Sequence, residues 1–405
     1  MILDESMGTH WGSMQLRNRV FLLKPKYHLF GHVHGHLEQK YMMASYSLME
    51  QILIAPMRCA INQRFLTNIK IRKASNLLKR VVKMEQSNNP IYKHHFSEVA
   101  FLDEMVEPTP WRGQESQNSF SFKGEGNKRE ILQKVFNINI PEEKYREAIS
   151  GSGNKGNRIT VLHSSSLAAL LFFHSVSDIN PIKIVLDDEE YTFTEVHFER
   201  KTVVSGSHKS NMDVVMYGNS GKGEKTVLFL ECKFSEYLNS GKCSGISTDV
   251  YKQTYEQLGL FKDGTIAKMK ANSTDDKNYF ELNSCGNKYQ YCKGIKQMIS
   301  HYIGISNFIR SGYKSEDEDD FSLPFTPDRV LLAEVLFGFP NTIDSKNRLQ
   351  EYKTAYKELA VAINNYNKNK VFHMVSKILT YGDIFSPDKF KLPKRIEEFY
   401  RLQEV

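Results

Sequence analysis

Residues 210–234 read S-N-M-D-V-V-M-Y-G-N-S-G-K-G-E-K-T-V-L-F-L-E-C-K-F and contain two apolar runs around a Gly-Lys-Gly turn. Runs rich in Val, Leu, Met and Phe on either side of a glycine turn predict a β-hairpin. Side chains on a strand alternate between its faces, so Glu231 and Lys233 share one face with Phe229. The opposite face is apolar and carries Leu228, Leu230, Cys232 and Phe234. The hairpin therefore predicts one buried face and one face that presents a carboxylate and an amine.

The expected strand pairing places further carboxylates beside Glu231. Antiparallel pairing centred on Lys222 sets Asp213 directly opposite Glu231 on the same face. The preceding run T-F-T-E-V-H-F-E-R-K-T-V-V (192–204) also alternates, and pairing centred on Gly206 sets Glu199 opposite Asp213. A slip of one residue would send an acid to the other face. In this register, three acids from three adjacent strands line one face of a sheet.

Facing carboxylates repel each other unless a cation lies between them, which predicts a metal site. Hard oxygen ligands with open positions for water and phosphate suit Mg²⁺, with Mn²⁺ as an alternative. Asp213 and Glu231 are the expected ligands, and Glu199 is a further candidate. Lys233 could position and help to deprotonate a water and stabilise charge on a phosphate. The competing interpretation is a solvated sheet face with cross-strand ion pairs.

These residues resemble the motif of the PD-(D/E)XK nuclease superfamily, in which an acid ends one strand and a Glu-x-Lys lies on the next. The apolar segment S-S-S-L-A-A-L-L-F-F-H-S-V (164–176), with Ser164 as N-cap, fits the helix that precedes this motif, although Met212 stands where the family often has proline. The resemblance covers about residues 95–400. It implies an α/β fold with a restriction-endonuclease-like core, a mixed central β-sheet with an antiparallel meander flanked by helices. It also implies Asp213, Glu231 and Lys233 as the metal and catalytic set, with Glu199 as an additional member.

Other segments predict the elements around this hairpin. Residues 329–337 predict a buried strand, and residues 291–309, 346–366 and 392–402 predict helices. The first of these helices has a buried stripe at Ile295, Met298, Ile299, Tyr302 and Phe308 or Ile309. The glycine-rich segment S-G-S-G-N-K-G-N-R (150–158) predicts a flexible loop.

The polar face of the helix at 291–309 carries one more candidate for the site. Some nucleases of the superfamily place a Gln on a helix beside the metal, and Gln297 is the candidate here. The alternatives are an ordinary polar helix face at this position, or the segment 251–259 in the same role. His301 is expected to be a surface or hydrogen-bonded histidine and not a metal ligand.

The first 60 residues resemble the C-terminal end of a calcineurin-like metallophosphoesterase. The resemblance rests on the sequence G-H-V-H at 31–34, which would supply His32 and His34 to a two-metal centre. The upstream motifs of that family, Asp-x-His, Gly-Asp-x-x-Asp and Gly-Asn-His, are not in this chain. Residues 1–62 are therefore interpreted as a remnant, 63–94 as a basic linker helix and 95–405 as the nuclease-like domain.

The net charge of +7 is concentrated near the start of the chain. Residues 1–93 contain 14 Lys and Arg against five Asp and Glu, whereas residues 94–405 contain 40 against 42. The segment 58–83 has no acidic residue and could contact nucleic acid, contact a membrane surface or link two domains. The nuclease-like part is nearly neutral, so its overall charge gives no support for DNA binding.

Composition places the chain among ordinary globular proteins, with 40% hydrophobic and 25% charged residues. No apolar run is long enough to span a bilayer, so no membrane partner is expected. The five cysteines form no C-x-x-C motif, and their odd number predicts a reducing, cytoplasmic location.

The expected function is a metal-dependent endonuclease of the restriction type that cleaves double-stranded DNA, as a homodimer by resemblance. Asp213→Ala or Lys233→Ala is expected to abolish cleavage with little loss of fold. The alternatives are a catalytically silent nucleic-acid-binding protein of the same fold and a truncated calcineurin-like metallophosphoesterase.

Overall fold

The computed structural model describes residues 5–6, 9–10, 84, 87, 89–102, 105–109, 119–151, 155–206, 208–238, 267–271, 278–282, 292–314, 321–367, 369–385 and 390–402. For 5–6, 9–10, 100, 205, 267–271, 278–282, 292–293 and 295–296 it describes the backbone alone. The chain divides into two compact units, Met1–Ala74 and Ser75–Val405. In the first unit, β1 (Glu5–Ser6) and β2 (Thr9–His10) pair antiparallel. Apart from β1 and β2, the predicted phosphoesterase remnant lies outside the described residues, and His32 and His34 lie outside them too. Nearly all of the basic linker and the alternative segment 251–259 also lie outside.

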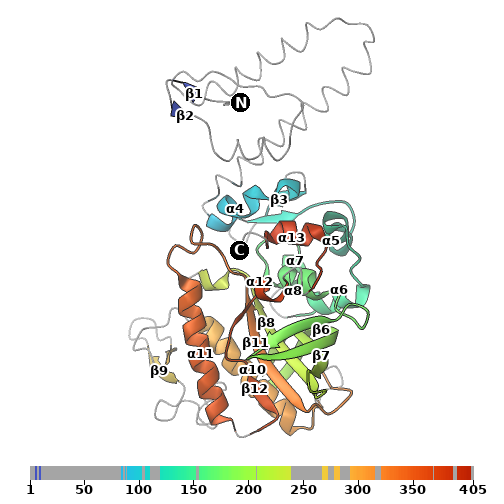
Figure 1. Ribbon diagram of the computed structural model, residues 1–405, viewed down its shortest axis with the longest axis vertical. Coiled ribbons are helices and arrows are strands. Elements are labelled where there is room, and N and C mark those ends of the chain that lie inside the picture. Colours follow the sequence, from blue (N-terminus) through green and yellow to red (C-terminus); the bar gives the residue numbers. More distant parts are fainter. Residues whose placement is uncertain are drawn as a thin grey trace, which may run out of the picture. The chain divides into compact units, whose positions relative to one another are not determined.

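A mixed seven-stranded sheet forms the centre of the second unit (Figure 1). Its order is β12-β11-β8-β7-β6-β5, and β13 pairs with β11. Strands β5 to β8 form an antiparallel meander, and β11 runs parallel to β8, β12 and β13. The strands are β5 (Ile182–Leu186), β6 (Glu189–Ser205), β7 (His208–Ser220), β8 (Lys225–Lys233), β11 (Arg329–Leu336), β12 (Phe372–Met374) and β13 (Leu379–Thr380). This architecture confirms the predicted α/β fold with a restriction-endonuclease-like mixed sheet.

Both predicted registers of the meander are observed. In the β7–β8 hairpin Val214 pairs with Leu230, which is the pairing centred on Lys222. In the β6–β7 hairpin Phe198 pairs with Val214 and Arg200 with Met212, so Glu199 lies opposite Asp213. The alternation of apolar residues sets this register, because a slip would expose an apolar face to water.

The two faces of the sheet are covered by different helices. Phe229 of β8 contacts Phe308 of α10 (Cys292–Arg310), whose stripe at Met298, Ile299 and Tyr302 is buried as predicted. On the other face Phe234 contacts Tyr400 of α13 (Lys394–Tyr400). The helix α8 (Ser165–Phe173) also packs on β7 and β8, and it is buried because it is apolar on every side.

The remaining elements complete the layers around this sheet. The 19-residue helix α11 (Arg348–Tyr366) matches the helix predicted at 346–366. The smaller elements are α4 (Pro90–His94), η1 (Phe96–Glu98), η2 (Ala100–Leu102), β3 (Val106–Pro108), β4 (Phe120–Phe122), α5 (Lys128–Phe136), α6 (Glu142–Ile149), α7 (Lys155–Arg158), η3 (Glu236–Leu238), β9 (Ala267–Ala271), β10 (Asn278–Leu282) and α12 (Tyr381–Ile384). Tyr92 of α4 is fully buried, so the core of this unit begins before residue 95.

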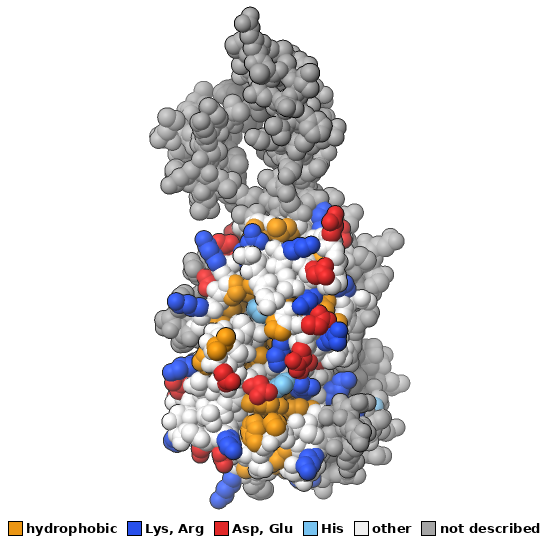
Figure 2. Space-filling model, turned by 90° about the vertical axis from the view of Figure 1, so that its right-hand side faces the viewer, with side chains coloured by type: hydrophobic (Ala, Val, Ile, Leu, Met, Phe, Trp, Pro, Cys, Tyr) orange, Lys and Arg blue, Asp and Glu red, His pale blue; other side chains and the backbone are white. Residues whose placement is uncertain are grey.

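The surface of the second unit mixes charges of both signs. Figure 2 shows acidic and basic side chains interspersed on one face, in keeping with the nearly neutral balance of residues 94–405. Among the described residues, no helix is long and apolar enough to cross a bilayer.

Candidate active site

Four carboxylates from four neighbouring strands form a row across the sheet. Glu199, Asp213 and Glu231 follow from the registers of the meander, and the parallel pairing of β8 with β11 aligns Glu231 with Glu334. Glu199 and Asp213 are each 6% exposed, Glu231 is 2% exposed and Glu334 is fully buried. Buried acids require partners, so the contacts of this row determine what it can do.

Glu199 and Asp213 share the ammonium group of Lys155. Lys155 Nζ donates to Asp213 Oδ1 at 2.7 Å and to Glu199 Oε1. Asn211 Nδ2 donates to the second oxygen of Glu199, and the Cys232 backbone N–H donates to Asp213 Oδ2 at 2.9 Å. All four oxygens of this pair therefore accept a hydrogen bond within the protein.

Glu231, Lys233 and Gln297 form a closed set of contacts. Lys233 Nζ donates to Glu231 Oε1 and, at 2.8 Å, to Gln297 Oε1. Gln297 Nε2 donates to Glu231 Oε1 at 3.2 Å. The α10 helix thus brings Gln297 to the Glu-x-Lys of β8, where the sequence predicted a polar helix residue.

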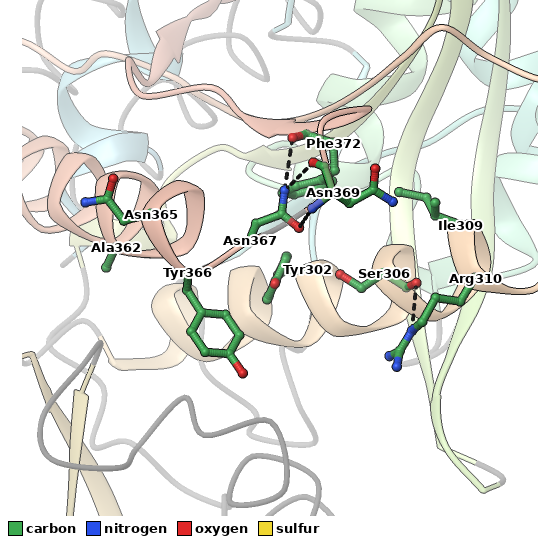
Figure 3. Close-up of a pocket in the computed structure, with 10 residues that line it drawn as sticks. All are labelled: Tyr302, Ser306, Ile309, Arg310, Ala362, Asn365, Tyr366, Asn367, Asn369 and Phe372. Carbon is green, nitrogen blue, oxygen red and sulfur yellow. Dashed lines mark hydrogen bonds between the residues drawn. The ribbon is translucent and has the colours of Figure 1, made fainter.

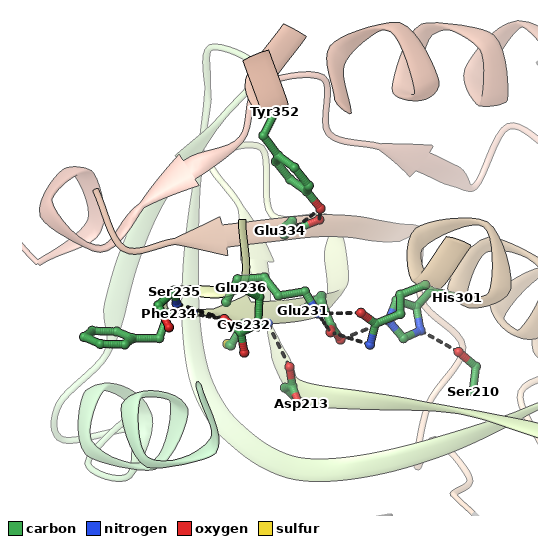
Figure 4. Close-up of polar contacts among 12 residues, drawn as sticks. Ser210, Asp213, Glu231, Cys232, Phe234, Ser235, Glu236, His301, Glu334 and Tyr352 are labelled. Atoms are coloured by element: carbon green, nitrogen blue, oxygen red, sulfur yellow. Dashed lines mark hydrogen bonds and ion pairs between the residues drawn. The ribbon is translucent and has the colours of Figure 1, made fainter. Parts of the chain in front are cut away.

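A buried histidine holds the other oxygen of Glu231 (Figure 4). His301 Nε2 lies 2.9 Å from Glu231 Oε2, and His301 Nδ1 lies 2.5 Å from Ser210 Oγ. Because the carboxylate can only accept, Nε2 carries a proton and donates to Glu231, and Ser210 Oγ is the partner of Nδ1. Gly304 allows α10 to lie this close to β6, because a Cβ at position 304 would lie 2.3 Å from Thr202 Oγ1. The hydrogen-bonded role predicted for His301 is confirmed, and the residue is buried.

Glu334 is held by a tyrosine from α11. Tyr352 Oη lies 2.8 Å and 3.1 Å from the two carboxyl oxygens of Glu334. Burial raises the pKa of Glu334 to about 8, so Glu334 is mainly protonated at neutral pH. This neutral acid lies next to Glu231 without adding a second full charge.

Removing the Tyr352 hydroxyl should destabilise the protein. Tyr352→Phe leaves buried oxygens of Glu334 without their donor, and we expect a loss of about 1–3 kcal/mol in the free energy of unfolding. Chemical denaturation measures this loss. Tyr400→Phe is the matched control, because the buried Tyr400 hydroxyl has no hydrogen-bond partner in the described part of the chain. Equal free energies of unfolding for the two variants would contradict a stabilising hydrogen bond between Tyr352 and Glu334.

The acids of this row differ in pKa because their neighbouring groups differ. Burial raises the pKa of Asp213, and the adjacent Glu231 raises it further. Burial would also raise the pKa of Glu231, but Lys233 and His301 outweigh it and hold that pKa below its ordinary value. For Glu199, burial raises the pKa to about 8 although Lys155 opposes the rise.

The two lysines of the site remain charged. Burial alone would lower the pKa of Lys233, but Glu231 raises it above the ordinary value. For Lys155, burial has the same lowering effect and Asp213 and Glu199 raise the pKa. Both ammonium groups are therefore hydrogen-bond donors in this site and not proton acceptors.

The donor set at Asp213 and Glu231 fits a hard divalent cation. The two carboxylates lie on neighbouring strands, and the negative charge of Glu231 disfavours ionisation of Asp213, so a cation shared by them would be stabilised. Among the described residues, no group of three His, Cys, Asp or Glu side chains is placed to hold a metal. Mg²⁺ commonly uses one or two carboxylates and takes its other ligands from water and phosphate, so two acids suffice.

Sequence reasoning missed Lys155, Glu334, Ser210 and Asn211 as members of this site. Lys155 falls in the predicted flexible loop at 150–158, where the structure instead has the single-turn helix α7. The loop prediction is therefore wrong for 155–158. Glu334 is the one charged residue in V-L-L-A-E-V-L-F (330–337), and that isolated acid was the available signal.

A separate cavity lies between α10, α11 and β12 (Figure 3). Its volume is about 810 Å³, and its lining includes Tyr302, Tyr366, Phe372 and Arg310. None of the predicted site residues lines it. The carboxylate row is therefore distinct from this cavity.

Residues 172–276 match the family model described as PD-(D/E)XK nuclease superfamily. The matched segment contains β5 to β8 with Glu199, Asp213, Glu231 and Lys233, and it ends before Gln297. No curated protein and no solved structure matches the chain significantly. The match and the mixed sheet agree, and residues 172–276 are similar to the PD-(D/E)XK nuclease superfamily.

Proposed function

We propose that this protein is a metal-dependent nuclease that hydrolyses phosphodiester bonds in double-stranded DNA, as an endonuclease of the restriction type. The observation that carries the proposal is the register that sets Asp213 opposite Glu231, with Lys233 two residues further on the same face of β8. The match of residues 172–276 to a superfamily of nucleases supports the same reaction class.

Asp213 and Glu231 would hold Mg²⁺, or Mn²⁺ in its place. When bound, the ion would polarise the scissile phosphate and stabilise its negative charge. Glu231 is oriented for this role by His301 and Gln297, which fix both of its oxygens. We further propose a cytoplasmic homodimer, a form that suits cleavage of a palindromic site.

Lys233 would act on the substrate as a charged donor. Its raised pKa favours positioning a water and stabilising charge on the phosphate, and disfavours the proton-accepting role expected from the sequence. Gln297 accepts from Lys233 and keeps the ammonium close to Glu231.

A second candidate is a silent DNA-binding protein of the same fold. The observation that favours it is that Lys155 and Lys233 already neutralise the acidic row. The two functions differ in turnover, since a silent binder would hold DNA in a salt-sensitive manner without cleaving it.

Incubation of the purified protein with supercoiled plasmid, with Mg²⁺ or with EDTA, tests the proposal. We expect nicked or linear product only with Mg²⁺, and a salt-dependent mobility shift when EDTA is present. Binding without cleavage across a set of plasmids of varied sequence would favour the silent binder.

A further inference from the structure

The Glu199–Asp213 pair contains a cation supplied by the protein itself. The Lys155 ammonium lies 2.7 Å from Asp213 and also contacts Glu199, and the Lys155 side chain is 17% exposed. Asn211 Nδ2 donates to Glu199 Oε2, and the Cys232 backbone N–H donates to Asp213 Oδ2. Both oxygens of Glu199 thus accept from side chains of the protein, whereas the sequence had placed Glu199 beside a metal.

The segment around Lys155 is fixed by several contacts. Lys128 Nζ donates to the Gly156 carbonyl at 2.7 Å, and Ile159, at the end of this turn, is fully buried. Gly151 packs directly on the pair, because a Cβ there would lie 2.0 Å from Glu199 Oε2 and 2.8 Å from Lys155 Cδ. A side chain at position 151 would therefore displace Glu199 or Lys155.

Glu199 itself has a strained backbone. Its φ is 55°, a left-handed conformation that costs a non-glycine residue on the order of 1 kcal/mol. The pairs on either side of it keep the same register, so the strand does not need this distortion in order to pair. The strained residue is thus the one whose carboxylate binds Lys155.

We propose that Lys155 is the resident cation of the Glu199–Asp213 pair and limits the site to one divalent ion, held by Asp213 and Glu231. The inference rests on the proposed function, because it presumes a metal at Asp213 and Glu231. In two-metal phosphodiesterases the ions lie about 3.5–4 Å apart and share carboxylates. An ammonium group bonded to Asp213 Oδ1 and to Glu199 would exclude a second ion from between these two carboxylates. Asp213 keeps acceptor capacity for a metal, since each carboxylate oxygen has two lone pairs.

The test is the number of Mn²⁺ ions bound by the full chain without DNA, measured by calorimetry and electron paramagnetic resonance after EDTA treatment and dialysis. Wild type should bind one ion with an uncoupled spectrum. Lys155→Met should bind two and show the spectrum of a spin-coupled pair, and Lys155→Arg, which keeps the charge, should bind one. Glu199→Gln should bind one ion, with an affinity within about threefold of the wild-type affinity. Removal of a residue that supports a metal ligand lowers metal affinity by about 10–100-fold, so a change this small would show that Glu199 does not support the ion.

Three outcomes separate the inference from the function on which it rests. One ion in wild type and two in folded Lys155→Met would support the inference. If Lys155→Met binds one ion, or Glu199→Gln weakens the single ion by tenfold or more, the inference is overturned and the one-metal nuclease proposal stands. No ion in any variant would overturn the proposed function itself. Glu199→Gln keeps the test decisive if Lys155→Met does not fold.

Discussion

Lys233→Met will lower the rate of metal-dependent DNA cleavage by about 10²–10³-fold, the range seen when one donor that stabilises developing charge is removed. Methionine is similar in length and uncharged, so the apolar stem of residue 233 stays packed while the ammonium is lost. Glu231 keeps His301 and Gln297 as partners, so the acid remains oriented. DNA affinity should change little, because one buried cation contributes little to a phosphate-binding surface.

Single-turnover cleavage at saturating Mg²⁺ measures this loss. Lys183→Met is the matched control, because Lys183 lies on β5 of the same sheet with a side chain 58% exposed and a surface partner, Glu190. The control should cleave at the wild-type rate. A Lys233→Met rate within threefold of wild type would remove Lys233 from the catalytic set.

Glu231→Ala will destabilise the protein by about 3–5 kcal/mol, which is the usual cost of breaking a buried charged pair by removing one partner. The Lys233 side chain is 9% exposed and would lose its carboxylate, and His301 would lose the acceptor for its Nε2 proton. The sequence predicted little loss of fold for Asp213→Ala and Lys233→Ala, whereas the burial of Lys233 in this ion pair predicts a loss of stability for Lys233→Ala as well. Isosteric replacements are the appropriate variants.

A double-mutant cycle with Lys233→Met checks this explanation. Removing both partners should cost less than the sum of the single losses, because neither charge is then left alone. Urea denaturation at neutral pH gives each free energy of unfolding. Additive losses would show that Glu231 and Lys233 do not interact in the folded protein.

The meander and its three acids could be predicted because the signals are local. Glycine turns at 221–223 and 206 set the pairing centres, and period-two alternation sets the faces, so Glu199, Asp213 and Glu231 are brought together within one short segment. The periodicity of α10 likewise placed Gln297 on the polar face that meets β8.

The other half of the site depends on contacts across long sequence distances. Lys155 meets Asp213 from a glycine-rich segment 58 residues away, and such composition predicts a loop whatever its partners. Glu334 reaches the row only through a parallel pairing of β11 with β8, which no hairpin turn specifies. Burial of these two residues, and the charge balance that results, follows from tertiary packing.

The most direct test of the central claim is cleavage of supercoiled plasmid by wild type, Glu231→Gln and Glu195→Gln in Mg²⁺ and in EDTA. Glu195 is the control, because it lies on β6 in the same sheet with its side chain 53% exposed and bonded to His197. We predict cleavage by wild type and Glu195→Gln in Mg²⁺ only, and none by Glu231→Gln. Equal Mg²⁺-dependent cleavage by folded Glu231→Gln and wild type would contradict the assignment of this carboxylate row as the active site.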